Sequence, residues 1–264
     1  MKKWLVRGAL ALVAVYLAVV AGMFIFQRDL QYERGGKVFE LSETKLTGAE
    51  KIAVQTPDGG TINGWFEAPA YGKPVILYYR GNSESFSREY ERFEAFVAAG
   101  YGFMSFDYRG FPASPGELTQ EHALADSLAA FDFVADTGAP VVIWGRSLGS
   151  GPATYVAAKR GALGLVLETP FLSAAAVAAE RYPFLPVGLV MQDQYPVNQW
   201  IKDVDEPVFV AHGTADTTIP VHHGKDVYAL ALRPAGLWIV EGGTHSDLWD
   251  KGLWTEVQGF IAGL

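Results

Sequence analysis

The stretch from Val141 to Gly151 reads VVIWGRSLGSG, and it joins a short apolar run to a glycine-rich turn and then to small residues. The run VVIW has the length and β-branched character of a buried strand, and the small residues that follow suit a closely packed helix. Glycines two positions before and two positions after Ser147 allow close backbone approach at a tight turn. We therefore predict a strand, a sharp turn and a helix, with the Ser147 hydroxyl at the carboxyl end of the strand. An ordinary glycine-rich turn with a capping serine is the alternative.

Short apolar runs alternate with amphipathic stretches on both sides of this turn. We expect strands at 51–56, 61–68, 74–79, 102–106, 141–144, 163–167, 208–211 and 237–240. We expect helices at 86–99, 121–136, 148–160, 222–232 and 247–261. Strands that are apolar on both faces and separated by helices indicate an α/β fold, with a mostly parallel central sheet and helices on both faces. The first two runs flank Pro57-Asp58-Gly59-Gly60, which predicts an antiparallel N-terminal hairpin.

The N-terminal segment is apolar and uncharged from Gly8 to Phe26, and basic residues precede it. A helix of that length spans about 28 Å, close to the thickness of a bilayer's hydrocarbon core. We expect residues 1–27 to form a membrane anchor, made of a cytoplasmic tail and a transmembrane helix. A cleaved signal peptide is the alternative, although the large residues at the end of the run do not suit a cleavage site. The tight basic cluster before the run favours a non-cytoplasmic location for the rest of the chain.

The remaining chain is predicted to be a connector, residues 28–50, and one domain, residues 51–264. Proline and aromatic residues gather in RYPFLPVGLVMQDQYPVNQW, residues 181–200, and interrupt the alternation of strands and helices. We interpret this as a small lid insertion at about 173–203. The lid's apolar residues indicate an acyl chain or another apolar group as substrate, with simple lid packing as the alternative. These residues are Phe184, Leu185, Val190, Met191, Tyr195 and Trp200.

Composition excludes several classes of function. The chain has 264 residues, enough to bury a large core, and its formal net charge is −8. Such acidity argues against a nucleic-acid partner, which requires a basic surface to neutralise phosphates. The chain has no cysteine, which excludes disulfides, cysteine-ligated metals and thiol nucleophiles.

A serine hydroxyl is a weak nucleophile that needs a general base, and the base needs a carboxylate to orient it. Two later loops supply candidates, because Asp216 follows the run VFVA and His245 follows the run LWIV. The chain order Ser147, Asp216, His245 and both placements predict a catalytic set. Taken singly, Asp216 reads as a turn residue and His245 as a capping or surface residue. Glu168, at the end of an earlier strand, is the alternative acid.

Attack on a carbonyl also requires hydrogen-bond donors for the oxyanion. We expect one from the backbone N–H of Leu148 and a second from the loop that follows the strand PVILYY. In that loop Asn82 is the expected donor and Ser83 the alternative. A plain surface turn is the other interpretation of the loop.

The other histidines are His122, His212, His222 and His223. The pair His222-His223 is a poor metal site, because neighbouring helical positions point in different directions and no third ligand is evident. We expect His212 to pack near the site or support it, and Asp247 to cap the last helix. The sequence therefore implies no metal and no cofactor.

With these residues identified, the chain resembles the α/β-hydrolases, and in particular the membrane-anchored serine hydrolases known as Bem46-like or abhydrolase-domain proteins. The resemblance covers about residues 50–262. Besides the turn at Ser147, its motifs are NGWF (63–66), RGN (80–82), FDYRGF (106–111), SPGE (114–117), YPFLP (182–186), HGTAD (212–216) and GTH (243–245). The resemblance implies an α/β-hydrolase fold and hydrolysis of an ester or thioester through an acyl-enzyme.

One position departs from the family pattern, which usually has His-Gly-Asn where this chain has Arg80-Gly81-Asn82. A backbone donor does not need that histidine. Arg80 is expected to pair with Asp107 or a nearby carboxylate, or to reach the mouth of the site. Expected substrates are a small-molecule or lipid-like acyl compound or an acylated protein. A peptidase of the same fold and a non-catalytic binding scaffold are the alternatives.

Overall fold

The computed structural model describes residues 2–264 and contains one eight-stranded sheet in the order β1-β2-β4-β3-β5-β6-β7-β8. The strands are β1 (Glu50–Gln55), β2 (Thr61–Glu67), β3 (Val75–Tyr79), β4 (Gly102–Phe106), β5 (Val141–Arg146), β6 (Gly164–Glu168), β7 (Val208–Gly213) and β8 (Pro234–Val240). β1 pairs antiparallel with β2 and β2 antiparallel with β4, whereas the pairs from β4 to β8 are parallel. The predicted sheet, with its antiparallel start, is confirmed.

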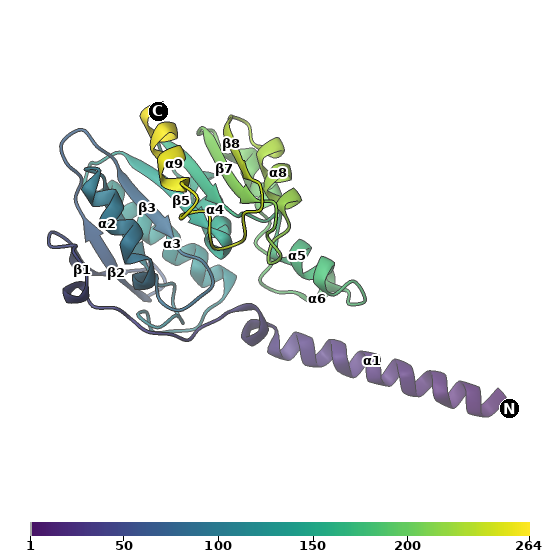
Figure 1. Cartoon of the computed structure of the whole chain (residues 1–264). Coiled ribbons are helices and arrows are strands. Elements are labelled where there is room, and N and C mark those ends of the chain that lie inside the picture. Colours follow the sequence, from purple (N-terminus) through teal and green to yellow (C-terminus); the bar gives the residue numbers. More distant parts are fainter. Residues whose placement is uncertain (1) are drawn as a thin grey trace.

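Helices cover both faces of this sheet (Figure 1). They are α2 (Tyr90–Ala98), α3 (Gln120–Ala135), α4 (Ser150–Ala157), α8 (Val221–Leu230) and α9 (Leu253–Ala262). Side chains of β3 alternate between two cores, because successive strand residues point to opposite faces. Val75, Leu77 and Tyr79 join the core under α3, α4 and α8, whereas Ile76 and Tyr78 join the core under α2 and α9. Burial on both faces explains why the central strands are apolar throughout.

Several helix boundaries differ from the sequence prediction, and two of these differences lie next to Ser147 and His245. The last helix begins at Leu253 and not at residue 247, because residues 241–252 form turns that carry His245. Asp247 caps one of these turns by accepting the N–H of Thr244 at 2.7 Å, so it does not cap the last helix as expected. Helix α4 begins at Ser150, after a short 3-10 turn at Ser147–Gly149.

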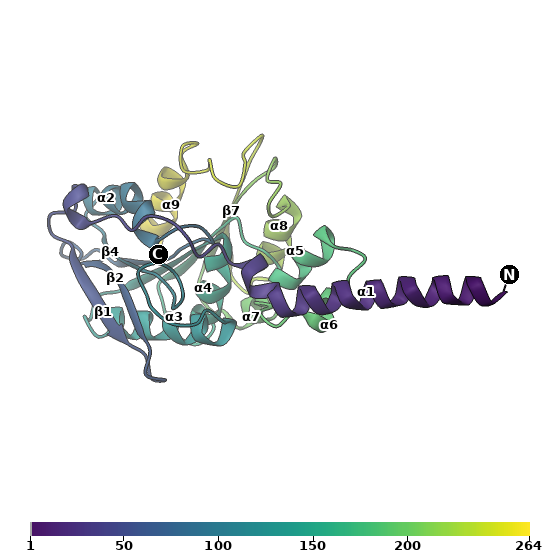
Figure 2. The same cartoon turned by 90° about the horizontal axis from the view of Figure 1, so that it is seen from below.

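The segment 173–203 contains three short helices, α5 (Ala174–Arg181), α6 (Val187–Val190) and α7 (Val197–Trp200). It lies beside α1 (Lys2–Gln31), the N-terminal helix, whose amino-terminal part projects from the rest of the molecule (Figures 1 and 2). Helix α1 is long and apolar enough to cross a membrane, and none of the window that meets this test is buried. From Tyr16 onward the helix contacts the globular part, mainly through the segment 174–195 and also through Asn82 and Glu117.

Candidate active site

Ser147 sits in a strained turn between β5 and α4. Its φ of 51° lies in the left-handed region, which non-glycine residues adopt rarely and at an energetic cost. The turn is closed by Ser150, whose hydroxyl donates to the Ser147 carbonyl at 2.7 Å. A side chain at Gly149 would overlap the carbonyl oxygen of Tyr79 at the end of β3. The two predicted glycines therefore permit the close approach that holds Ser147 at the carboxyl edge of the sheet.

Three side chains distant in sequence form one hydrogen-bonded chain at this edge. Nε2 of His245 lies 2.9 Å from Oγ of Ser147, and Nδ1 of His245 lies 2.7 Å from Oδ2 of Asp216. The loop after β7 carries Asp216 and the loop after β8 carries His245. Because parallel strands end at the same edge, the two loops meet the turn at Ser147. Nε2 is thus oriented to accept the serine proton.

The Asp216 carboxylate is held by several donors at once. Oδ1 accepts the backbone N–H groups of Thr218 and Ile219, each at 2.8 Å. Nε2 of His212 lies 3.2 Å from Oδ2 and donates to the carbonyl of Ile219 at 2.8 Å. Burial raises the pKa of Asp216, but the bonds from His212 and His245 outweigh it, so the net pKa lies below the ordinary value. The group is therefore charged at every pH at which the protein is expected to work.

This lowered pKa predicts how stability depends on pH. A carboxylate whose pKa is lower in the folded state contributes its full stabilisation above its unfolded value, 3.8, and loses it progressively as the pH falls from near that value to the folded value. We expect the free energy of unfolding of the wild type to fall more steeply than that of Asp216→Asn as the pH drops from 5 to 3. Urea denaturation at each pH measures the difference. Parallel curves for the two proteins would contradict the assignment.

Glu168, the alternative acid, belongs to a different network. Its two oxygens accept from Nη1 and Nη2 of Arg92 at 2.7 and 2.9 Å, and Oε2 also accepts from the indole of Trp144. Arg146 Nε lies 3.3 Å from Glu168 Oε1. Because both oxygens of Glu168 already accept hydrogen bonds from buried donors, neither is available to accept from His245. Glu168 is therefore a structural residue that fastens α2 to the central sheet.

Replacing Glu168 is accordingly expected to reduce stability. Within residues 2–264, Glu168→Gln removes one of the two carboxylates that pair with the buried Arg92, and only Glu89, 2.8 Å from Arg92 Nε, remains. Weakening such charge-assisted hydrogen bonds costs about 2 kcal/mol. Chemical denaturation should show this loss in the free energy of unfolding, while kcat of the folded fraction stays within a few-fold of the wild type. A variant with normal stability and kcat lowered by orders of magnitude would return Glu168 to the catalytic set.

The loop after β3 lies against the turn at Ser147. A Cβ built on Gly81 would be 3.6 Å from Cβ of Ser147. Asn82 lines the same pocket as Ser147 and Leu148, and its backbone N–H has no backbone acceptor among residues 2–264. The N–H of Leu148 lies in the first turn of a helical segment, where N–H groups lack intrahelical acceptors. Both expected oxyanion donors thus border the pocket beside the serine.

Arg80 is buried below this loop and does not reach the mouth of the site. Its Nε lies 3.4 Å from Oδ1 of Asp107, its Nη2 donates to the carbonyls of Ser83 and Glu84, and its guanidinium stacks 4.1 Å from the Phe111 ring centroid. Of the outcomes left open by the sequence, the structure shows pairing with Asp107. The arginine thereby braces the loop that presents Asn82.

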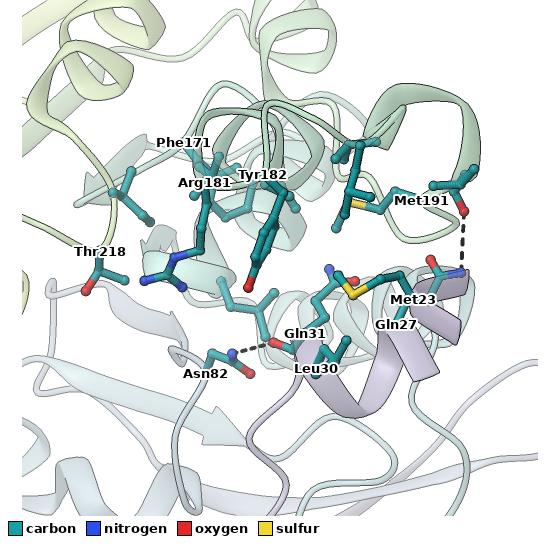
Figure 3. A pocket seen from close by; sticks show the side chains of 18 of the residues that line it. Met23, Gln27, Leu30, Gln31, Asn82, Phe171, Arg181, Tyr182, Met191 and Thr218 are labelled. Atoms are coloured by element: carbon teal, nitrogen blue, oxygen red, sulfur yellow. Dashed lines mark hydrogen bonds between the residues drawn. The ribbon is translucent and has the colours of Figure 1, made fainter. Parts of the chain in front are cut away.

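A cavity of about 260 Å³ opens at Ser147, and its surface is largely apolar (Figure 3). Leu185, Val190 and Met191 line it, as the lid interpretation expected. Phe184 is not among the lining residues and is 64% exposed. Tyr195 is not a lining residue either, because its ring is buried against Gly151 and its hydroxyl bonds to that of Tyr32. The inner face of α5, which the sequence did not single out, supplies Ala174, Val177, Ala178 and Arg181.

Helix α1 forms a further wall that sequence reasoning missed. Its lining residues are Met23, Phe24, Gln27, Leu30 and Gln31. Figure 3 shows this helix end beside Asn82, whose side chain donates to the Gln31 carbonyl at 2.7 Å. The available signal was the pair Gln27 and Gln31, one helical turn apart on one face of the helix just after its uncharged run.

The two adjacent histidines do converge, contrary to expectation. The rings of His222 and His223 stack with centroids 4.5 Å apart, and their Nε2 atoms lie 2.9 and 3.3 Å from Oε1 of Glu180. However, Nδ1 of His223 accepts the N–H of Leu172 at 3.2 Å, which places the proton of the neutral ring on Nε2. A metal ligand needs a free lone pair at that nitrogen. The cluster therefore fits a polar contact between α5 and α8 better than a metal site.

Comparison with known proteins agrees with this architecture. The family described as serine aminopeptidase, S33 matches residues 72–196. The uncharacterised protein Rv2307c of Mycobacterium tuberculosis is 31% identical over 90% of this chain and 89% of its own length. The rat lysophosphatidylserine lipase ABHD12 is 29% identical over 63% of this chain and 48% of its own length. The Pyrococcus furiosus esterase Pf2001 superposes with a TM-score of 0.69 at 17% identity, over 87% of this chain and 96% of its own. The sheet order, the turn at Ser147 and these relatives together place the chain in the α/β-hydrolase superfamily, to which it belongs.

Proposed function

We propose that the protein is a serine hydrolase that cleaves an ester or thioester of an acyl group. The observation that carries this proposal is the chain of hydrogen bonds from Ser147 through His245 to Asp216, with Ser147 lining an apolar cavity. A base within hydrogen-bond reach of the nucleophile, itself oriented by a carboxylate, is the geometry that activates a hydroxyl.

The proposed reaction has two stages, formation of an acyl-enzyme and its hydrolysis. Oγ of Ser147 attacks the carbonyl carbon as His245 takes the serine proton, and the N–H groups of Leu148 and Asn82 stabilise the oxyanion. The intermediate then collapses, and the leaving alcohol or thiol takes the proton from His245. Water gives a proton to the same imidazole as it attacks the acyl-enzyme, and the carboxylic acid leaves while Ser147 recovers its proton. Asp216 stabilises the imidazolium in both stages. No step needs a cofactor.

The cavity supports a substrate with an apolar acyl chain. Apolar side chains from α1, α5 and α6 line most of it, and Ser147 is one of its lining residues. Named relatives include a lysophosphatidylserine lipase and an esterase, which supports a small-molecule or lipid substrate. We further propose that residues 1–27 anchor the protein in the membrane, that 28–50 connect the anchor to a domain at 51–264 and that 173–203 act as its lid. The basic residues before Gly8 support a non-cytoplasmic location for this domain.

A fluorophosphonate probe tests the proposal directly. We expect the purified full-length protein to form one covalent adduct, which peptide mass spectrometry locates at Ser147. His245→Ala should suppress both the adduct and the hydrolysis of p-nitrophenyl butyrate. A folded protein that hydrolyses no ester and forms no adduct would favour the binding-scaffold alternative, and preferential cleavage of an aminoacyl amide would favour a peptidase.

Arg181 gives a prediction about the polar part of the substrate. Its guanidinium lines the cavity and forms no ion pair with any residue from 2 to 264. We expect Arg181→Gln to raise KM about tenfold for lysophosphatidylserine, which is anionic, because one charge-assisted hydrogen bond is worth about 1.5 kcal/mol or more. The KM for a neutral monoacylglycerol should not change. Arg160→Gln, which removes an arginine paired with Asp132 outside the cavity, is the control. Equal effects on both substrates would contradict this role.

A further inference from the structure

Residues 182–192, here called the lid tip, lie alongside the part of α1 that is apolar enough to cross a membrane. The hydroxyl of Tyr16 donates to the carbonyl of Phe184 at 3.0 Å, although the two residues are 168 positions apart. Closer to the globular domain, Gln27 donates to the Val190 carbonyl at 3.4 Å and accepts the N–H of Gln192 at 2.7 Å. The segment 184–192 therefore runs alongside α1 from residue 16 to residue 27.

This pairing fixes the depth of the lid relative to the anchor. Tyr16 lies ten positions before Phe26, the last residue of the uncharged run. Ten helical residues span about 15 Å, which is half of a hydrocarbon core about 30 Å thick. If α1 spans the bilayer through this run, a lid tip that touches Tyr16 must lie well inside the adjacent leaflet.

The composition of the lid tip fits hydrocarbon. No charged residue occurs between Arg181 and Asp193, and the part of α1 beside this stretch, residues 16–27, is uncharged as well. Leu185 and Val187 pack against Val20 and Met23 on the inner side. On the outer side Phe184 is 64% and Leu189 is 89% exposed. Exposed apolar side chains on an uncharged segment are typical of surfaces that enter a membrane interface.

The charged residues mark where this apolar region ends. Arg28, two residues beyond the uncharged run, pairs with Asp193 at 3.0 Å and with Glu117 at 2.9 Å. The lid residue Asp193 also accepts from the hydroxyl of Tyr32 at 3.0 Å. These polar contacts join the end of α1 to the end of the uncharged lid segment at one level. Water and lipid headgroups at that level would solvate them, whereas hydrocarbon would not.

We propose that the lid tip, residues 182–192, inserts beside α1 into the hydrocarbon of one leaflet, and that the substrate's acyl chain enters the catalytic cavity laterally from that leaflet. Met23, Phe24 and Leu30 of α1 form one wall of the entry, and Leu185, Val187 and Met191 of the lid form the other. The lipid partner is thus the fatty acyl chain of a bilayer lipid. The entry route rests on the proposed hydrolase function, whereas the insertion of the lid does not.

Insertion can be measured without any assay of activity. Because the chain has no cysteine, a single introduced cysteine carries one label at a known site. Full-length Phe184→Cys and Leu189→Cys are labelled with the fluorophore NBD and reconstituted into phosphatidylcholine vesicles. The control is Tyr71→Cys, at a fully exposed position between β2 and β3. We expect blue-shifted emission and strong quenching by lipids with a nitroxide on the acyl chain at the two lid positions only. Lid labels that respond like the control would overturn the proposal.

The entry route is tested by placing a larger side chain on α1 so that the proposed entry is narrowed. In Met23→Trp the larger ring occupies the lateral entry, so the ratio of kcat/KM for a sixteen-carbon acyl ester in vesicles to that for p-nitrophenyl butyrate should fall at least tenfold. Ile25→Trp changes an exposed position that is not among the lining residues, and should keep the wild-type ratio. Equal ratios in both variants would refute lateral entry. Loss of all ester hydrolysis and of the Ser147 adduct in the wild type would instead refute the proposed function.

Discussion

Replacement of Ser147 by alanine is expected to lower kcat for ester hydrolysis about 10⁶-fold and to abolish labelling by fluorophosphonates. The variant lacks the atom that attacks the carbonyl, and His245, 2.9 Å from that atom, then has no proton to accept. Loss of an interaction made by the nucleophile should appear in kcat, because substrate binding in the apolar cavity remains. Steady-state kinetics with p-nitrophenyl butyrate, run against a matched buffer blank, measure the effect.

The control for this prediction is a second buried serine. Ser127 lies in α3, where its hydroxyl donates to the Ala123 carbonyl, and Ser127→Ala should lose only about 1 kcal/mol of stability. We expect this variant to retain the fluorophosphonate adduct and kcat. If Ser147→Ala keeps more than a hundredth of the wild-type kcat, another residue is the nucleophile.

Asp216→Asn is expected to lower kcat about 10⁴-fold with little change in KM. The carboxylate accepts a hydrogen bond from the Nδ1–H of His245 at 2.7 Å, which keeps the proton of the neutral ring on Nδ1 and leaves Nε2 free to act as a base. An amide presents an N–H instead, which favours the tautomer with its proton on Nε2. That tautomer cannot accept the proton of Ser147. The buried charge that stabilises the imidazolium is lost as well.

Two measurements separate this effect from simple unfolding. Circular dichroism and the thermal midpoint should show a folded Asp216→Asn protein, since Thr218 and Ile219 retain an oxygen acceptor at this position. Glu168→Gln should show the opposite pattern, with lost stability and a nearly normal kcat. If both variants lose stability and kcat together, the separation of catalytic from structural carboxylates is wrong.

The sequence predicted those parts of the molecule that depend on local pattern. The turn at Ser147 could be identified because strand, glycines and small-residue helix are contiguous. Asp216 and His245 could be placed because each directly follows an apolar run. All strands of a parallel sheet end at the same edge, so residues that directly follow such strands lie at that edge. Local sequence was therefore enough to predict that the three residues lie on the same side of the sheet.

The features that escaped prediction depend on how distant segments dock. The cavity wall formed by α1 requires contact between residues 16–32 and 184–195, and no local period records that contact. The same is true of Glu180, which is brought to His222 and His223 by the packing of α5 on α8. Tyr195 was expected to contact substrate as one of the apolar residues of the segment 173–203, but its hydroxyl bonds to that of Tyr32, so it joins this segment to the end of α1.

The hydrogen bonds between Asn82 and the end of α1 determine which form of the protein should be purified for kinetic work. Oδ1 of Asn82 accepts the N–H of Glu33 at 3.1 Å, and its amide donates to Gln31. A truncated protein that starts after Tyr32 would lack the Gln31 carbonyl that accepts from Asn82. It would also lack the apolar wall that α1 contributes to the cavity. The shortened protein would have a less restrained Asn82 loop and a cavity open to water on the side that α1 now covers, so its kinetics would differ from those of the full-length chain. Detergent micelles or nanodiscs holding the intact polypeptide are therefore the appropriate starting material.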